Sequence, residues 1–326
     1  IYGYEKIPTA LPTASLTPPE QNLDLFWQDI IKDALKESGF TEAYNYSFIG
    51  EKDLSKFVYS DQDRAELVKL QNPISEEFSY LRNSLLENLL KNIAANQRRF
   101  ENVRMFELGT IFQQTDKGIE ETTMLGGVTT TTTEGSFYDA KGVIDFIVNQ
   151  LGIPEVWYDE YKPTPQRSRQ ILWQTTKCAE VKIGDQEIGF LGEISSQMTS
   201  RLKITQKVTA FHINVERLAQ LATEEKEYLP PSRYPSVVRD IAVLVPRDVS
   251  VGDVLDKINE AEKMLVADVD LFDMYEGEEI PDGKKNLAFH IVYQSKEKTL
   301  TNREVDALHD KIIKTLETDP GWEVRK

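Results

Sequence analysis

Three stretches in the C-terminal third carry small, polar and aromatic side chains at positions where they could contact the unpaired bases of a nucleic acid. In residues 237–245, 266–275 and 286–294, large apolar side chains recur at every second position, which predicts three strands with one face against helices. The side chains predicted to face the helices are Ile241, Val243, Val245, Phe272, Met274, Leu287, Phe289 and Ile291. The opposite, open face would carry Asp240, Ala242 and Leu244, then Leu271, Asp273 and Tyr275, and finally Asn286, Ala288 and His290.

The open face has the chemistry of a surface that binds single-stranded RNA. Small residues at the centre of a sheet let a base lie flat, and an aromatic side chain such as Tyr275 at its margin can stack on that base. Asp240 and Asn286 could then form hydrogen bonds with base edges. The nearest basic residues, which are candidates for phosphate contacts, are Lys284, Lys285, Lys296, Lys298 and Arg303. From the residues alone, an ordinary solvated sheet face is the favoured interpretation of the same alternation.

Signatures of catalysis are absent from the sequence. It contains no Gly-rich phosphate loop, no Gly-x-Ser-x-Gly and no His-Glu-x-x-His motif. The single cysteine, Cys178, excludes an internal disulfide, and the three histidines lie far apart. The Asp-rich stretch 268–273 alternates with apolar residues, which indicates a strand with one solvated face rather than a metal site. We therefore predict no catalytic residue and no metal ligand.

The elements around the three strands predict a ferredoxin-like domain. Ser250 and Asp253 begin a helix that is expected to end near residue 263. Thr301 and Glu304 form a capping box that begins a second helix, running to about Leu316. A short strand over residues 322–324 closes the series. The resulting βαββαβ order is typical of the ferredoxin-like fold.

The preceding residues predict long helices on a mainly antiparallel sheet, which is an α+β fold. Apolar residues at helical spacing predict helices over residues 20–38, 81–98 and 139–151. Strands are expected over residues 43–49, 103–112 and 123–133, and two or three more within 171–194. Gly184 and Asp185 mark a turn in the last of these stretches.

Prolines and charges suggest the domain boundaries. Residues 1–19 contain four prolines and are predicted to connect the chain to a preceding module. A first domain is expected over residues 20–222, a charged and proline-stiffened linker over 223–232, and a second domain over 233–326. The first residue is Ile and no signal peptide follows, so we expect a portion of a larger protein.

Composition restricts the class of protein. Of the 326 residues, 40% are apolar, as in a globular protein with a real core, and the lone cysteine fits a reducing compartment. No run of about 18 uncharged apolar residues predicts a membrane span. The net charge is −16, and both predicted domains are acidic, which argues against indiscriminate binding to nucleic acid. Any RNA contact is expected to be local and directed by shape, or to be assisted by other subunits.

Motifs in the first predicted domain resemble a known family. They are Asn72–Glu77 (NPISEE), Leu81–Leu86 (LRNSLL), Val103–Phe112 (VRMFELGTIF) and Ile188–Glu193 (IGFLGE). This series is similar to the catalytic-like module of the bacterial phenylalanyl-tRNA synthetase beta subunit, and Ile1–Pro8 resembles the exit from the module before it. The chain departs from the family at two places, where Glu87-Asn88 replaces the usual Pro-Gly and Ser195-Ser196 replaces a frequent His-Pro.

The second predicted domain resembles the ferredoxin-fold anticodon-binding domain of the same subunit. The matching motifs are Arg233–Val243 (RYPSVVRDIAV), Leu271–Gly277 (LFDMYEG), Ile280–Phe289 (IPDGKKNLAF) and Lys298–Thr301 (KTLT), followed by Glu304-Val305. The resemblance implies that Asp240, Ala242, Tyr275 and Asn286 contact the tRNA anticodon.

The resemblance also implies a class II synthetase fold that has lost its chemistry. A working class II site needs arginines on the phosphates of ATP, and the expected Gly-x-Gly-x-x-Arg arrangement is missing. Arg82, Arg98, Arg99 and Arg104 are interpreted instead as helix-face and interface charges.

By the same resemblance, the chain would pack on the alpha subunit of a cytoplasmic α₂β₂ enzyme that binds no membrane. That enzyme attaches phenylalanine to tRNA with ATP and Mg²⁺ at the alpha subunit, so this portion itself needs no cofactor and is expected to be non-catalytic. Two other hypotheses remain open at this point. They are a free-standing class II ligase and a small-molecule-binding regulatory protein.

Overall fold

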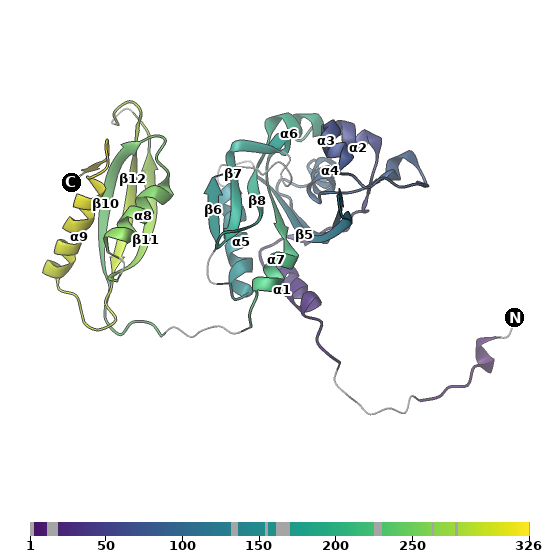
Figure 1. The fold of residues 1–326 in the computed structure, drawn as a ribbon, viewed down its shortest axis with the longest axis horizontal. Coiled ribbons are helices and arrows are strands. Elements are labelled where there is room, and N and C mark those ends of the chain that lie inside the picture. The colour runs from purple at the N-terminus through teal and green to yellow at the C-terminus, as the bar shows by residue number, and fades with distance from the viewer. Residues whose placement is uncertain are drawn as a thin grey trace. The chain divides into compact units, whose positions relative to one another are not determined.

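The protein is described by a computed structural model that covers residues 3–11, 19–131, 136–153, 156–160, 170–224, 230–262, 264–277 and 280–325. The chain divides into two compact units, residues 1–226 and 227–326 (Figure 1). Parts of the predicted connector and linker, residues 1–2, 12–18 and 225–229, lie outside the described residues. The finer domain boundaries therefore stay a prediction.

A twisted sheet forms the centre of the first unit. Among the described residues it has seven strands in the order β1-β4-β5-β9-β8-β7-β6, and all neighbours are antiparallel except β1 and β4. The strands are β1 (Thr41–Glu42), β4 (Arg104–Thr115), β5 (Gly118–Thr131), β6 (Trp157–Glu160), β7 (Trp173–Ile183), β8 (Gln186–Ile194) and β9 (Lys207–Asn214). A separate pair joins β2 (Phe48–Ile49) to β3 (Tyr80–Leu81).

Helices cover both faces of this sheet because neighbouring strand residues point to opposite sides. Phe211 packs in one core with α1 (Leu23–Glu37), α5 (Ser136–Gln150) and α7 (Val215–Leu221). Its neighbour Ala210 packs in a second core with α2 (Glu51–Lys56), α4 (Leu86–Asn96) and α6 (Ser196–Leu202). The short elements α3 (Asp61–Ala65), η1 (Tyr4–Lys6), η2 (Glu76–Phe78) and η3 (Gln170–Leu172) lie between the larger ones.

Several predicted elements of the first unit differ from those observed. The helix expected from Leu81 begins only at Leu86, because residues 80–81 pair with β2 and the Ser84 hydroxyl accepts a hydrogen bond from the Leu86 amide. Its predicted apolar stripe is nevertheless buried. The strand expected over 43–49 is reduced to the two residues of β2, and β9, α6 and α7 had no counterpart among the predicted elements.

The second unit has the predicted ferredoxin-like order. It comprises β10 (Val237–Pro246), α8 (Val251–Ala261), β11 (Val266–Tyr275), β12 (Lys284–Tyr293), α9 (Asn302–Leu316) and β13 (Glu323–Arg325). The strands form an antiparallel sheet in the order β11-β12-β10-β13. Both predicted caps are present, since Ser250 with Asp253 and Thr301 with Glu304 form capping boxes.

The core of the second unit lies on one side of its sheet. Side chains from α8 and α9 pack there with alternate residues of the strands, such as Ile241 and Phe289. The opposite face carries no described helix and is the open face. In the described part of the chain, no helix is both long and apolar enough to cross a bilayer.

Candidate nucleic-acid interface

Strand register places the four predicted anticodon contacts together on the open face. Residues that pair across an antiparallel ladder share a face of the sheet. Asn286 pairs with Tyr275 on one side and with Leu244 on the other, while Ala242 pairs with Ala288 and Asp240 with His290. These pairs form three successive rows of open-face side chains. The sheet therefore brings Asp240, Ala242, Tyr275 and Asn286 onto one surface.

The middle of this surface carries only small side chains, and an exposed aromatic ring lies at its Tyr275 end. Ala288 is buried and Ala242 half-buried, so the row between the two polar rows projects little above the backbone. Tyr275 is 45% exposed. A Cβ at Gly277 would lie 2.1 Å from the Tyr275 hydroxyl oxygen, so the absence of a side chain at Gly277 makes room for this ring. The side-chain oxygen of Asn286 is buried and accepts no hydrogen bond from any described residue.

The predicted alternation was wrong in β11, because the strand contains a bulge. Leu271 pairs with Phe289 and Asp273 with Ala288, which leaves Phe272 as an extra residue. Leu271, expected on the open face, packs against the core. Phe272, expected in the core, is 48% exposed. Met274 pairs with the core residue Leu287, so the predicted alternation gives its face correctly, although its side chain is exposed on the edge strand.

The bulge creates an aromatic contact that the sequence pattern did not reveal. The Phe272 ring stacks on the His290 imidazole, with centroids 3.9 Å apart and planes inclined by 13°. The same imidazole forms a 2.7 Å hydrogen bond between its Nδ1 and Oδ1 of Asp240. Two aromatic residues three positions apart in β11 were the available signal, since regular alternation cannot place both on one face.

The predicted phosphate contacts do not all share this surface. Lys284 pairs with Pro246 and belongs to the open face by alternation, whereas Lys285 pairs with the core residue Val245. The hydrogen bonds from Ser250 lower the pKa of Asp253 on α8, and the charge of Lys285 adds to this effect. Lys285 thus lies on the helix side.

Of the other candidates, Lys296 is exposed on the loop after β12, and Lys298 and Arg303 lie close to the beginning of α9. Lys298 is ion-paired with Glu304, and Lys298 together with Thr301 lowers the pKa of Glu304 to about 2. Arg303 is exposed on the first turn of α9, the helix that packs on the opposite side of the sheet. Of the five candidates, Lys284 is the one that alternation places on the surface with Tyr275, and all five stay predictions as phosphate contacts.

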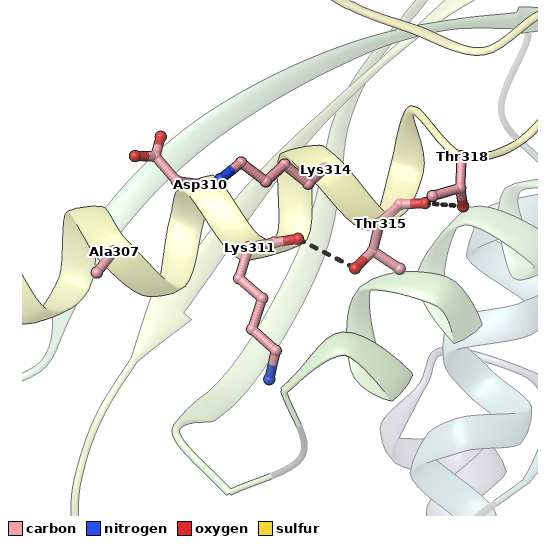
Figure 2. Close-up of a pocket in the computed structure, with 6 residues that line it drawn as sticks. All are labelled: Ala307, Asp310, Lys311, Lys314, Thr315 and Thr318. Atoms are coloured by element: carbon pink, nitrogen blue, oxygen red, sulfur yellow. Dashed lines mark hydrogen bonds between the residues drawn. The ribbon is translucent and has the colours of Figure 1, made fainter.

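A hollow of about 310 Å³ lies along α9 and takes no part in this surface (Figure 2). Its lining residues come from one side of that helix and its C-terminal end: Ala307, Asp310, Lys311, Lys314, Thr315 and Thr318. They are mostly exposed and of mixed charge. The helix presents its apolar side, with Val305 and Ile312, to the core.

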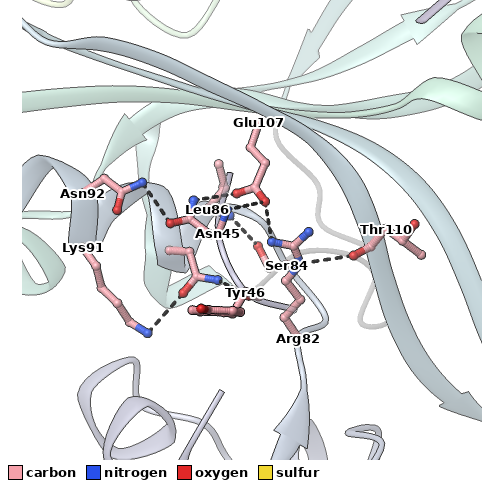
Figure 3. Close-up of polar contacts among 10 residues, drawn as sticks. Asn45, Tyr46, Arg82, Ser84, Leu86, Lys91, Asn92, Glu107 and Thr110 are labelled. Atoms are coloured by element: carbon pink, nitrogen blue, oxygen red, sulfur yellow. Dashed lines mark hydrogen bonds and ion pairs between the residues drawn. The ribbon is translucent and has the colours of Figure 1, made fainter. Parts of the chain in front are cut away.

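The first unit contains a buried polar cluster centred on Arg82 and Glu107 (Figure 3). The guanidinium Nη1 lies 2.6 Å from Glu107 Oε1, and both side chains are less than 5% exposed. Arg82 Nε donates to the carbonyl oxygen of Thr110, and the Asn45 side chain donates to Glu107 Oε2 at 2.7 Å. The prediction that Arg82 is a helix-face charge was therefore wrong. This residue precedes α4, and its buried guanidinium is bonded to Glu107 and to the carbonyl oxygen of Thr110.

These residues do not fit the phosphates of ATP. Arg82 cannot leave Glu107 without stranding a buried carboxylate. Arg104 donates to the carbonyl oxygen of Ser38 and lies 3.8 Å from the Asp139 carboxylate. A Cβ at Gly109 would lie 2.6 Å from Arg82 Nη2, so the guanidinium also fills the space above that strand. Among the described residues, no three His, Cys, Asp or Glu side chains gather as metal ligands.

Comparison with family models matches both units. Residues 7–215 match the model described as "Phenylalanyl tRNA synthetase beta chain CLM domain". Residues 232–325 match the model of the ferredoxin-fold anticodon binding domain.

Curated relatives cover the whole chain. It is 31% identical to a phenylalanine–tRNA ligase beta subunit of Desulfotalea psychrophila, over 97% of this chain and 41% of that protein. It is 32% identical to the beta subunit of Geobacillus kaustophilus, over 100% of this chain and 41% of that protein. The chain thus spans about two fifths of the length of these relatives.

A solved structure shares the fold of a large part of the chain. The crystal structure of pyrrolysyl-tRNA synthetase from Desulfitobacterium hafniense aligns with a TM-score of 0.50 at 18% identity. The alignment covers 63% of this chain and 75% of that one. At this identity the likeness concerns the fold alone.

Proposed function

The chain belongs to the phenylalanyl-tRNA synthetase beta chain family, and from this premise we propose that it is the C-terminal portion of a phenylalanine–tRNA ligase beta subunit. In this proposal the complete enzyme is a cytoplasmic α₂β₂ heterotetramer that joins phenylalanine to its tRNA with ATP and Mg²⁺. The first unit packs on the alpha subunit, and the second binds the anticodon. Two family matches in the same order along one chain support this division.

The first unit acts in this proposal as a scaffold without a catalytic site of its own. The buried ion pair of Arg82 with Glu107 supports this role, because an arginine engaged in this way does not neutralise phosphate. ATP and Mg²⁺ are then bound by the alpha subunit.

We expect the purified 326-residue chain to show no phenylalanine-dependent exchange of pyrophosphate into ATP. The assembled enzyme, measured in parallel, provides the positive control. Exchange by the chain alone above the level without phenylalanine would contradict the scaffold role and favour a free-standing ligase.

Anticodon binding rests on one observation, the gathering of Asp240, Ala242, Tyr275 and Asn286 on a sheet face without a helix. Unpaired bases of an RNA loop expose their flat faces and their hydrogen-bonding edges. A low row of alanines beside an exposed tyrosine ring offers a complementary surface. The match of residues 232–325 to an anticodon-binding model supports the same conclusion.

Replacing Tyr275 by alanine in the assembled enzyme is expected to raise the KM for tRNA about 5- to 150-fold, since stacking on one base contributes about 1–3 kcal/mol. The measurement is aminoacylation at varied tRNA concentration. Met274→Ala is the matched control, because this neighbouring side chain is also about half exposed but pairs with the core residue Leu287. An unchanged KM for Tyr275→Ala, or an equal rise for both variants, would remove Tyr275 from the interface.

A further inference from the structure

The bulge in β11 adds a second aromatic surface to the open face. Phe272 is the extra residue, and its ring lies against His290 rather than in the core. Both side chains stay partly exposed, so the stacked pair presents aromatic surface to solvent. A stack of this kind can be extended by a nucleobase, because every base has a flat π face.

A hydrogen-bond acceptor stands beside this stack. Asp240 is bonded through Oδ1 to His290, while its side chain is 66% exposed. The bond to the imidazole fixes the carboxylate next to the aromatic pair and leaves Oδ2 without a partner among the described residues. An ionised carboxylate only accepts hydrogen bonds, so it fits the N–H groups on the edge of a base.

The charges around the stack favour a base over a phosphate. Asp270 pairs with His290 in the ladder, and Asp273 pairs with Ala288, so both belong to the open face and both are exposed. Together with Asp240 they make this part of the surface acidic, which repels phosphate groups. Lys284 belongs to the same face two rows beyond Ala288, where a phosphate is better accommodated. Bound RNA would therefore place a base, not its backbone, at Phe272.

The second surface is separate from Tyr275. Phe272 and Tyr275 are three residues apart on β11, a distance of about 10 Å along an extended strand. The alanine row lies between them. This distance is longer than one base is wide, so one base cannot contact both rings, whereas two nucleotides of a loop can.

We propose that Phe272 and His290, with the carboxylate of Asp240, form a second nucleobase site on the open face that binds a different unpaired loop base from the one at Tyr275. The proposal rests on the anticodon-binding function proposed above. It makes Phe272 and Asp240 a pair that acts on one base, by stacking and by hydrogen bonding to its edge.

The test combines protein variants with tRNAs that lack one base. The assembled enzyme is prepared as wild type and as Phe272→Leu, Phe272→Trp, Asp240→Asn and Tyr275→Leu. Binding is measured for phenylalanine tRNA and for a series in which each anticodon-loop nucleotide in turn is abasic. Phe272→Leu is expected to weaken binding of the intact tRNA about 5- to 150-fold, and Phe272→Trp to retain it, because tryptophan also stacks.

One abasic position is expected to abolish the effects of both Phe272→Leu and Asp240→Asn. A different abasic position should abolish the effect of Tyr275→Leu. If the same abasic position abolishes the effects of Phe272→Leu and Tyr275→Leu on tRNA binding, a single base spans the surface and the proposal of a second site is wrong.

The remaining outcomes separate this inference from the function on which it rests. If Tyr275→Leu weakens binding and Phe272→Leu does not, the second site is wrong and anticodon binding by the open face stands. If neither variant weakens binding while thermal unfolding shows both folded, the open face does not bind the anticodon and both proposals fail. Failure of Phe272→Trp to retain affinity would contradict a stacking role.

Discussion

Replacement of Arg82 by alanine is expected to lower the free energy of unfolding of the first unit by about 3–5 kcal/mol, because the variant leaves a buried carboxylate without its cation. Glu107 is only 4% exposed and would keep just the hydrogen bonds from Asn45. The desolvation of its charge would then be opposed by neutral donors alone. The side chain that covers Gly109 would be lost as well.

Urea unfolding followed by tryptophan fluorescence measures this effect. The first unit contains Trp27, Trp157 and Trp173, and a Trp322→Phe background removes the signal of the second unit. Arg104→Ala serves as the control, since its ion pair is exposed and 3.8 Å long, and a loss below about 1 kcal/mol is expected.

A double variant distinguishes the stranded charge from lost packing. Arg82→Met combined with Glu107→Gln keeps an acceptor for Asn45 but contains no buried charge. It is expected to recover at least half of the loss seen in Arg82→Ala. Equal destabilisation in the double variant would show that the cost lies in packing and not in the uncompensated carboxylate.

The second large effect expected is a loss of stability of the first unit at acidic pH that depends on His212. This residue lies on β9 between Gly126 of β5 and Phe190 of β8, and no described residue forms a hydrogen bond with its buried Nε2. Burial lowers the pKa of His212 to about 4, and the nearby Arg82 charge acts in the same direction. An unfolded histidine has a pKa of about 6.5.

The sign of the effect follows from proton uptake. Between pH 6.5 and pH 4 the unfolded chain binds a proton at His212 that the folded chain does not, so the free energy of unfolding falls as the pH falls. The contribution is fully present above about pH 6.5, and its loss by pH 4 amounts to about 3 kcal/mol.

The comparison of wild type with His212→Gln isolates this contribution from the carboxylates that titrate in the same range. His212 is the only histidine of residues 1–226, so the variant removes every imidazole from the first unit. The drop in unfolding free energy between pH 7.5 and pH 4.5 should be smaller in the variant by about 2–3 kcal/mol. Equal drops in both proteins would show that folded His212 protonates normally.

Local signals made the second unit largely predictable. Ser250 and Thr301 each carry their capping partner three residues later, and these caps begin α8 and α9 where expected. The alternation in β10 and β12 correctly identified the core side chains, because these two strands lie inside the sheet with one face fully covered. The four anticodon candidates were brought to one face for the same reason.

Features that depend on distant partners were not predictable from the pattern. The bulge at Phe272 is defined by the pairing of β11 with β12, and the spacing of Phe272 and Tyr275 alone does not locate it. Arg82 is buried because Glu107 and Asn45 arrive from other strands and loops, which a helical pattern over 81–98 cannot show. The strand β9 had no counterpart among the predictions, although it occupies the middle of the large sheet.

The bulge also bears on how a face of this kind is gained in evolution. Leu271 and Asp273 are in register with Phe289 and Ala288 on either side of Phe272, so removal of residue 272 would restore regular pairing at this point of the strand. Insertion of one residue therefore adds an aromatic side chain to the open face while the core positions of β11 and the place of Tyr275 are preserved.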